Sequence, residues 1–140
     1  MTLADPQKQA EWFSRVRLAH QSETTEDYVE LIADLIDVQK EARLKDLSKR
    51  FGVSDATASK IISRLQEEGY ITSRPYRSIF LTEKGEDLAR RCKERHQIIL
   101  DFLVRLGVSR ETAEYDAEGI EHHISAETLE IFKKFRPQDS

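Results

Sequence analysis

The segment LKDLSKRFGVSDATASKIISRLQEE, residues 44–68, decides the fold of this 140-residue chain, because it contains two short amphipathic helices around a tight turn. Apolar residues at helical spacing predict a first helix over 44–51 and a second over 55–68. Gly52 supplies the turn between them, and Ser54 stands where the N-cap of the second helix belongs. This order is typical of a helix-turn-helix unit.

A basic hairpin is predicted directly after the second helix. Gly69 ends that helix, and two short runs, 70–74 and 79–81, have the composition of strands. They are joined by Pro75-Tyr76-Arg77-Ser78. A hairpin in this position is the wing of a winged helix-turn-helix, a fold that binds the major groove of DNA.

Candidate DNA contacts lie on the second predicted helix and on the wing. Short polar side chains near the start of a helix allow its backbone to approach base edges, and basic groups pair with phosphates. The predicted contacts are Ser54, Asp55, Thr57, Ser59, Lys60, Arg64, Arg74, Tyr76 and Arg77. The alternative is a small helical domain with a solvated basic surface, because charged surfaces are common.

The formal charge changes sign along the chain. Residues 1–39 carry a net charge of -5, residues 40–95 a net charge of +5, and residues 96–140 a net charge of -4. The middle of the chain therefore produces the positive field that attracts phosphates, although the whole chain has a net charge of -4.

Helical patterns extend on the N-terminal side of this unit. Asp5 and Pro6 predict the start of a helix over about 5–21. A polar break is expected at 21–23, with a second helix capped by Thr24 or Thr25.

On the C-terminal side, a long helix is expected over about 82–106, followed by two shorter helices that begin near Ser109 and Ser125. The predicted fold is mainly α. A winged helix-turn-helix DNA-binding domain with an N-terminal helical extension covers 1–92, and a small all-helical domain covers 93–140.

Composition limits the remaining possibilities. A hydrophobic content of 39% is lean, so the small second domain is expected to gain stability by forming a homodimer. No apolar run approaches the ~20 residues of a membrane span. The single cysteine, Cys92, cannot form an internal disulfide, which fits a reducing compartment. We therefore expect a cytoplasmic protein with no membrane partner.

The segment DAEGIEHH, residues 116–123, is the most chemically specific part of the chain. In a helix, Glu118, Glu121 and His122 would share one face, at i, i+3 and i+4. Two carboxylates and one imidazole at this spacing are typical of divalent-metal sites, while the ordinary alternative is an acidic, solvated helix end. His123 is expected to point elsewhere.

Other candidate ligands have ordinary explanations when they are taken alone. His96 lies on an apolar helical stripe, where a histidine is more often a core residue than a ligand. Asp27 and Glu30 would lie in the first turn of a helix, where acidic groups and capping boxes are common. Cys92 is interpreted as a small buried hydrophobe.

In combination, these residues resemble the manganese-sensing branch of the diphtheria toxin repressor family. Asp27-Tyr28-Val29-Glu30, the winged unit, Glu94-Arg95-His96 and the 116–123 segment occur in the family's order. The resemblance covers about residues 25–135. It implies a DNA-binding domain followed by a helical dimerisation domain, with a two-metal site between the domains.

The resemblance also implies the ligands, which are Asp27, Glu30, His96, Glu118, Glu121 and His122. Iron-sensing relatives have sulfur-bearing residues in place of Asp27 and Glu121. Oxygen and imidazole donors suit Mn²⁺, with two ions expected per subunit, and such donors also accept Fe²⁺, Co²⁺, Cd²⁺ or Zn²⁺. The implied function is metal-promoted binding of a homodimer to double-stranded operator DNA, with repression of manganese uptake genes.

Two other classes of function account for parts of the sequence. A winged-helix regulator that responds to iron, or to a non-metal ligand, would share the DNA-binding unit. A carboxylate-bridged metalloenzyme also uses Glu and His on helices, but only one Glu-x-x-Glu-His is present. The sequence has no nucleophile–base arrangement or glycine loop for phosphate, so neither an enzyme nor a small organic substrate is expected.

Overall fold

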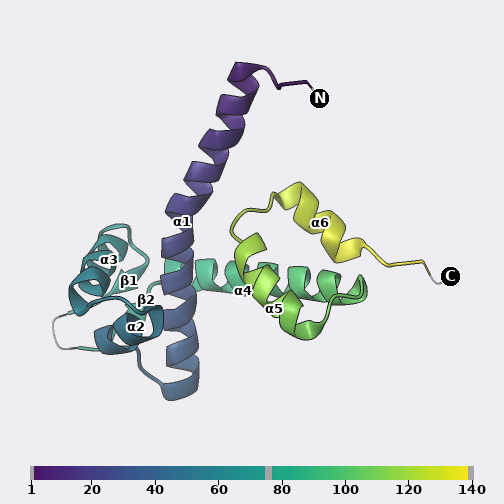
Figure 1. Cartoon of the computed structure of the whole chain (residues 1–140). Coiled ribbons are helices and arrows are strands. Elements are labelled where there is room, and N and C mark those ends of the chain that lie inside the picture. The colour runs from purple at the N-terminus through teal and green to yellow at the C-terminus, as the bar shows by residue number, and fades with distance from the viewer. Residues whose placement is uncertain (1, 75–76, 139–140) are drawn as a thin grey trace. The chain divides into compact units, whose positions relative to one another are not determined.

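The structure is a computed structural model that describes residues 2–74 and 77–138, and it confirms the mainly helical fold class (Figure 1). Its elements are α1 (Pro6–Gln39), α2 (Leu44–Phe51), α3 (Asp55–Glu67), β1 (Ile71–Thr72), β2 (Phe80–Leu81), α4 (Glu83–Arg105), α5 (Arg110–Ile120) and α6 (Ala126–Lys134).

The chain forms two compact units. One unit runs from Thr25 to Lys93, and the other combines the described residues up to Thr24 with those from Glu94 onward. The second boundary lies within α4, next to the predicted 92/93 boundary. The N-terminal extension, however, groups with the C-terminal unit, whereas the sequence predicted that it belongs to the DNA-binding domain.

The Thr25–Lys93 unit is a winged helix-turn-helix. In it, α2, α3 and the β1–β2 hairpin pack against one side of the C-terminal part of α1 (Figure 1). Its core contains Ile32, Leu47 and Leu65, all fully buried. Tyr28 of α1 stacks on Phe51 of α2, with 4.2 Å between the ring centroids. Because each buried side chain of this size contributes about 1.5–3 kcal/mol, these contacts hold α1 firmly in the unit.

Local sequence explains the turns of this unit. Gly52 follows α2 with a φ of 67°, a left-handed conformation that glycine adopts without strain. The Ser54 side chain caps α3 by accepting a hydrogen bond from the Thr57 amide at 3.1 Å. In the hairpin, β1 and β2 are antiparallel, with Ile71 opposite Leu81.

The predicted break in the N-terminal helix is wrong, because α1 is continuous over 34 residues. No proline or glycine follows Pro6 within this helix, so nothing in its backbone forces an interruption. Ser22 remains helical and donates its hydroxyl to the Ala19 carbonyl at 3.0 Å. Despite the length of α1, no helix in the described ranges is apolar enough to cross a membrane.

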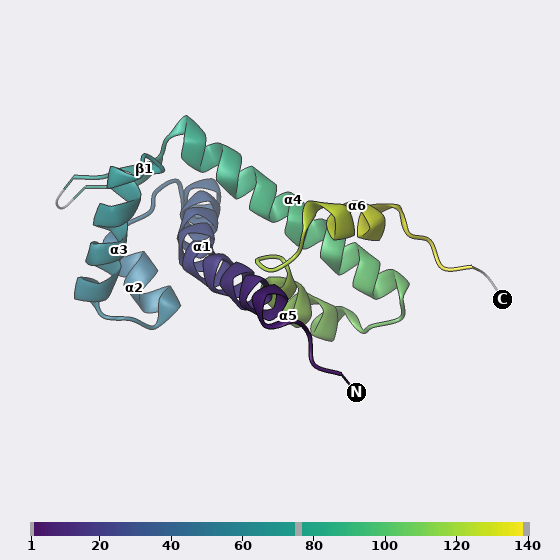
Figure 2. The ribbon, with the colours of Figure 1, turned by 90° about the horizontal axis from the view of Figure 1, so that it is seen from above.

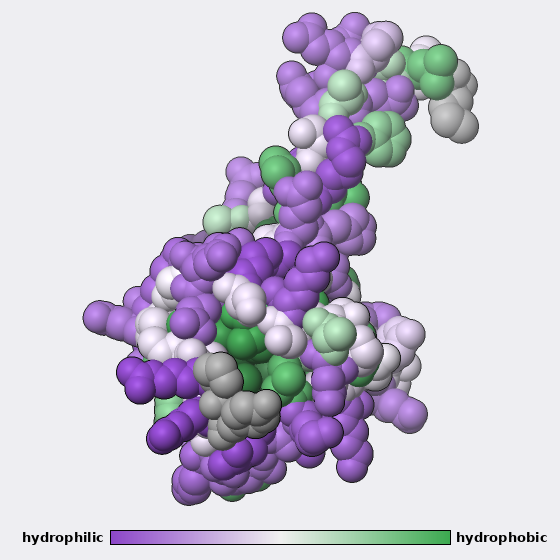
Figure 3. Space-filling model, turned by 90° about the vertical axis from the view of Figure 1, so that its left-hand side faces the viewer, coloured by the Kyte–Doolittle hydropathy of each residue, from purple (hydrophilic) through white to green (hydrophobic). Residues whose placement is uncertain are grey.

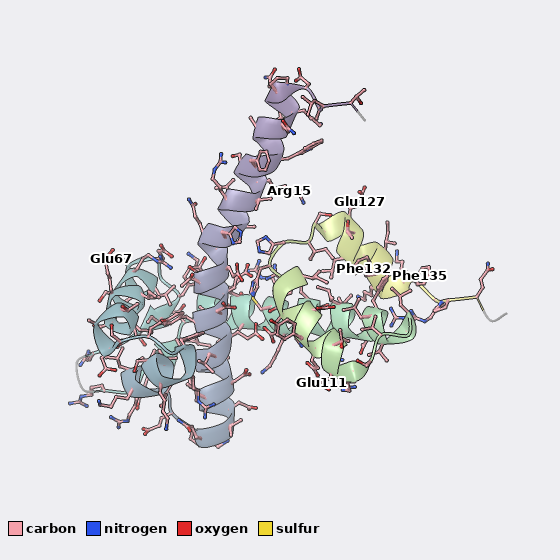
Figure 4. The ribbon with its side chains drawn as sticks, viewed as in Figure 1. Arg15, Glu67, Glu111, Glu127, Phe132 and Phe135 are labelled. Atoms are coloured by element: carbon pink, nitrogen blue, oxygen red, sulfur yellow. The ribbon has the colours of Figure 1, made fainter. Side chains whose placement is uncertain are left out.

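The other unit has a small helical core of its own. Figure 2 shows α6 along the C-terminal half of α4, and Phe132 of α6 stacks on Phe102 of α4, with 3.9 Å between the ring centroids (Figure 4). Ser109 and Ser125 cap α5 and α6, as their positions in the sequence predict. The buried residues of this core are Ile99, Leu100, Ala113 and Ala117.

Candidate metal centre and nucleic-acid interface

His96 on α4 faces two carboxylates that the 116–123 segment supplies. Its Nδ1 atom lies 3.5 Å from Glu118 Oε1 and 3.5 Å from Glu121 Oε2. One ligand atom from each of the three residues lies within 4.8 Å of the other two. In the part of the chain that the structure describes, the buried Nδ1 makes no hydrogen bond. Three of the predicted ligands therefore converge within one compact unit.

Glu121 and His122 lie just beyond α5, but Glu121 keeps helical backbone angles and faces the same His96 Nδ1 atom as Glu118, so only His122 leaves the predicted helical face. The helix ends at Ile120, Glu121 is its C-cap, and His122 lies in the following turn. Both side chains are almost fully buried, at 0% and 1% exposure, and His122 Nε2 lies 3.3 Å from Glu121 Oε1. The C-terminal end of α5 and the turn that follows it therefore place both side chains in the interior.

The chemistry of this cluster fits a divalent cation. Burying a carboxylate such as that of Glu121 is unfavourable without a compensating cation or positive partner. The Glu118 side chain is 61% exposed, so the cluster is open to solvent on one side. Carboxylate and imidazole donors suit Mn²⁺ and Fe²⁺, and the absence of thiolate makes the set unlike a structural zinc site.

Asp27 and Glu30 belong to the Thr25–Lys93 unit, where they are partly buried on α1. They lie at i and i+3, so they share one side of the helix. Because α1 continues through this region, neither residue is in a first helical turn. The capping explanation for these two acids is therefore wrong.

Glu114 is a further residue of the site that was not predicted from the sequence. Its Oε2 atom lies 3.2 Å from His96 Nε2, the ring nitrogen other than the one that faces Glu118 and Glu121. A carboxylate in that position fixes the tautomer and orientation of a metal-ligating histidine. The i, i+4 spacing of Glu114 and Glu118 on α5 was available in the sequence, but the contact depends on how α4 and α5 pack.

The predicted DNA-binding surface is exposed over most of its described length. Thr57, Ser59 and Lys60 of α3 are exposed, as are Arg74 and Arg77 beside the tip of the hairpin. Tyr76 lies outside the described residues.

A groove of about 640 Å³ lies between α2, α3 and the hairpin. Figure 3 shows this side of the molecule, with hydrophobic surface in a hollow that hydrophilic side chains border. The basic residues that line the groove are Arg43, Lys45, Arg74 and Arg77. Their positions suit contact with the phosphate backbone of DNA.

Ser54, Asp55 and Arg64 also have partners within the unit. Ser54 is the cap of α3, described above. Asp55 accepts a hydrogen bond from Ser48 Oγ at 2.6 Å, and this bond, followed by the charge of Lys45, lowers the pKa of Asp55. The Nη2 atom of Arg64 donates to Thr25 Oγ1 at 3.3 Å, which ties α3 to α1.

Comparison with known proteins gives two adjoining family matches. Residues 20–79 match the family described as iron dependent repressor, N-terminal DNA binding domain. Residues 82–136 match the family described as iron dependent repressor, metal binding and dimerisation domain.

Individual relatives match most of the chain. It is 49% identical over 97% of its length to the transcriptional regulator MntR of Salmonella typhimurium, covering 87% of that protein. It is 50% identical over 95% of its length to MntR of Escherichia coli O157:H7, covering 86% of that protein. It is also 36% identical over 75% of its length to the HTH-type transcriptional regulator MntR of Lysinibacillus sphaericus, covering 76% of that protein.

Solved structures share the fold. A manganese-dependent transcriptional repressor in complex with manganese superposes with a TM-score of 0.69 at 30% identity, covering 76% of this chain and 50% of that one. The manganese regulator SloR gives a TM-score of 0.67 at 26% identity, covering 78% of this chain and 51% of that one. The chain thus spans about half the length of these two solved proteins.

Proposed function

We propose a mechanism for this chain from the premise that it belongs to the MntR branch of the diphtheria toxin repressor family of metal-dependent regulators. It is a metal-responsive transcriptional repressor. We infer that its metal is manganese, that it acts in the cytoplasm as a homodimer on double-stranded operator DNA, and that it represses manganese uptake genes.

The observation that supports this most strongly is the convergence of His96, Glu118 and Glu121. The three side chains bring two carboxylates and a ring nitrogen together, with the Glu121 side chain fully buried. Asp27, Glu30 and His122 complete the proposed set of ligands for two ions per subunit. The bound ions would supply the positive charge that offsets the proposed carboxylate ligands.

Contacts within the winged unit give a route from Asp27 and Glu30 to the recognition helix. Both acids lie on the part of α1 that contributes to the core of this unit. One turn away or less, Thr25 accepts the hydrogen bond from Arg64 of α3, and Tyr28 stacks on Phe51 of α2. A change in the position or mobility of α1 at the ligands is therefore passed directly to α2 and α3.

The C-terminal unit provides the proposed dimer surface. Its sequence matches a dimerisation domain, and Val104, Leu106 and Ile131 remain 42%, 52% and 60% exposed. Homodimer interfaces bury apolar surface of this kind. A two-fold dimer would present two copies of α3 to major grooves about 34 Å apart.

Metal counting tests the proposal directly. The chain is titrated with Mn²⁺, and the free ion is measured by electron paramagnetic resonance. We expect two tightly bound ions per subunit, and loss of at least one in Glu121→Gln. The matched control, Glu111→Gln, changes an exposed acid on α5 and should bind as the unmodified chain does (Figure 4). Mn²⁺ binding that is equal in all three proteins would exclude the proposed centre, and a strong preference for Fe²⁺ would favour iron as the metal.

A further inference from the structure

A second group of possible ligands contains none of the proposed manganese ligands and lies within one compact unit, with a Glu23 carboxylate oxygen also within 4.8 Å of a ring nitrogen of His122. His20 and Glu23 occupy one side of α1, and His123 lies in the turn after α5. His20 Nδ1 lies 3.4 Å from Glu23 Oε2, and His123 Nε2 lies 3.5 Å from the same oxygen. The two imidazole rings meet edge to face, with 4.8 Å between their centroids.

We propose that His20, Glu23 and His123 form an additional metal site, selective for Zn²⁺ and chemically similar late first-row ions. A tetrahedral Zn²⁺ with bonds of about 2.0–2.1 Å places neighbouring ligand atoms roughly 3.3–3.5 Å apart. The separations of 3.4 Å and 3.5 Å at Glu23 Oε2 match that spacing. Charge-assisted hydrogen bonds are shorter, at about 2.7–2.9 Å, and one ligand atom from each of the three residues lies within 4.8 Å of the other two, so the group can accept a shared ion.

The donor set differs from that of the manganese centre. Two imidazoles and one carboxylate are the ligands of open zinc sites, in which water takes the fourth position. Divalent affinity for such donors rises from Mn²⁺ towards Zn²⁺ and Cu²⁺. The side chains of His20, Glu23 and His123 are 63%, 32% and 30% exposed, so an ion and its water can enter from solvent.

Occupation of this site would fasten α1 to the turn that follows α5. His123 directly follows His122, and the two residues share that turn with the end of α5. A bound Zn²⁺ would therefore restrict the backbone that presents Glu121 and His122. This consequence rests on the proposed function, whereas the site itself does not.

The test compares the zinc content of the full chain with that of His20→Ala and His123→Ala. Gln21→Ala is the matched control, because Gln21 is the exposed neighbour of His20 on α1. Zn²⁺ is titrated in competition with a chromophoric chelator, and Co²⁺ is used as a spectroscopic substitute whose visible absorption is intense when coordination is tetrahedral. We expect each histidine variant to lose one equivalent of zinc and the tetrahedral Co²⁺ bands, and the control to lose neither.

Two outcomes would overturn the proposal. One is equal zinc stoichiometry in the unmodified chain and in both histidine variants. The other is Co²⁺ bands that disappear in Glu121→Gln but persist in His20→Ala, which would place late metals at the manganese centre only. Counting the Mn²⁺ bound by His20→Ala distinguishes a failure of this proposal from a failure of the proposed function. The manganese stoichiometry of that variant should be unchanged.

Discussion

Replacing Glu114 should weaken manganese binding although Glu114 is not a proposed ligand. Its carboxylate lies 3.2 Å from His96 Nε2 and therefore orients the ring whose Nδ1 faces Glu118 and Glu121. Removing the carboxylate partner of a metal-ligating histidine typically weakens metal binding about 10–100-fold. The Glu114 side chain is 47% exposed, so solvent screens its charge. We therefore predict the lower end of that range, about tenfold or ~1.4 kcal/mol, for Glu114→Ala.

The assay is an Mn²⁺ titration followed by electron paramagnetic resonance. Glu114→Gln keeps an oxygen acceptor and loses only the charge, so it should recover part of the affinity that Glu114→Ala loses. Glu111→Ala, on the same helix, controls for a general effect of removing an acidic group from α5 (Figure 4). The explanation is refuted if Glu114→Ala binds Mn²⁺ as tightly as the unmodified chain, or if Glu111→Ala loses as much affinity.

Three further predictions concern the winged unit. The pKa of Asp55 is lowered, chiefly by the hydrogen bond from Ser48. The Asp55 carboxylate therefore stabilises the fold at pH values above the pKa of Asp55 in the unfolded chain. That stability is lost as the pH falls through the pKa of Asp55 in the folded chain. Ser48→Ala should raise the pKa of Asp55 in a carboxyl-carbon NMR titration, and an unchanged midpoint would contradict this. Gly85→Ala should destabilise the unit by about 1–3 kcal/mol in chemical unfolding. Its new Cβ would lie 2.1 Å from the Tyr70 carbonyl oxygen, and unchanged stability would show that the backbone moves freely there. Arg74→Ala and Arg77→Ala should each reduce the magnitude of the logarithmic salt slope of DNA binding by about 1, and an unaltered slope would remove that residue from the phosphate contacts.

Helix ends that carry their own stop or start residues were predictable from the sequence. Ser54, Ser109 and Ser125 each cap the helix that follows. The break near Ser22 was predicted wrongly because a run of polar residues is compatible with a solvated helix as well as with a turn. Thr25 is equally acceptable as a cap and as a buried helical residue. Thr25 contacts Arg64, which is 39 residues away in the sequence, and a local sequence pattern does not reveal such a contact.

The metal site was also predictable only in part from the sequence. The types and spacing of Glu118, Glu121 and His122 indicated divalent-metal chemistry before any fold was known. The spacing did not show that α5 stops at Ile120, so that Glu121 is its C-cap and His122 lies in the following turn. Contacts between elements distant in sequence, such as Glu114 with His96, depend on packing that periodicity does not determine.

The central claim is that metal at the proposed centre controls DNA binding, and the affinity for DNA with and without Mn²⁺ tests it most directly. A duplex selected from a random pool in the presence of Mn²⁺ serves as the probe, and its dissociation constant is measured by fluorescence anisotropy for the unmodified chain and for Glu121→Gln. Coupling between two sites typically changes affinity about 5–150-fold, and we predict an Mn²⁺-dependent increase in that range for the unmodified chain and almost none for the variant. Equal affinity of the unmodified chain with and without Mn²⁺ would contradict the account.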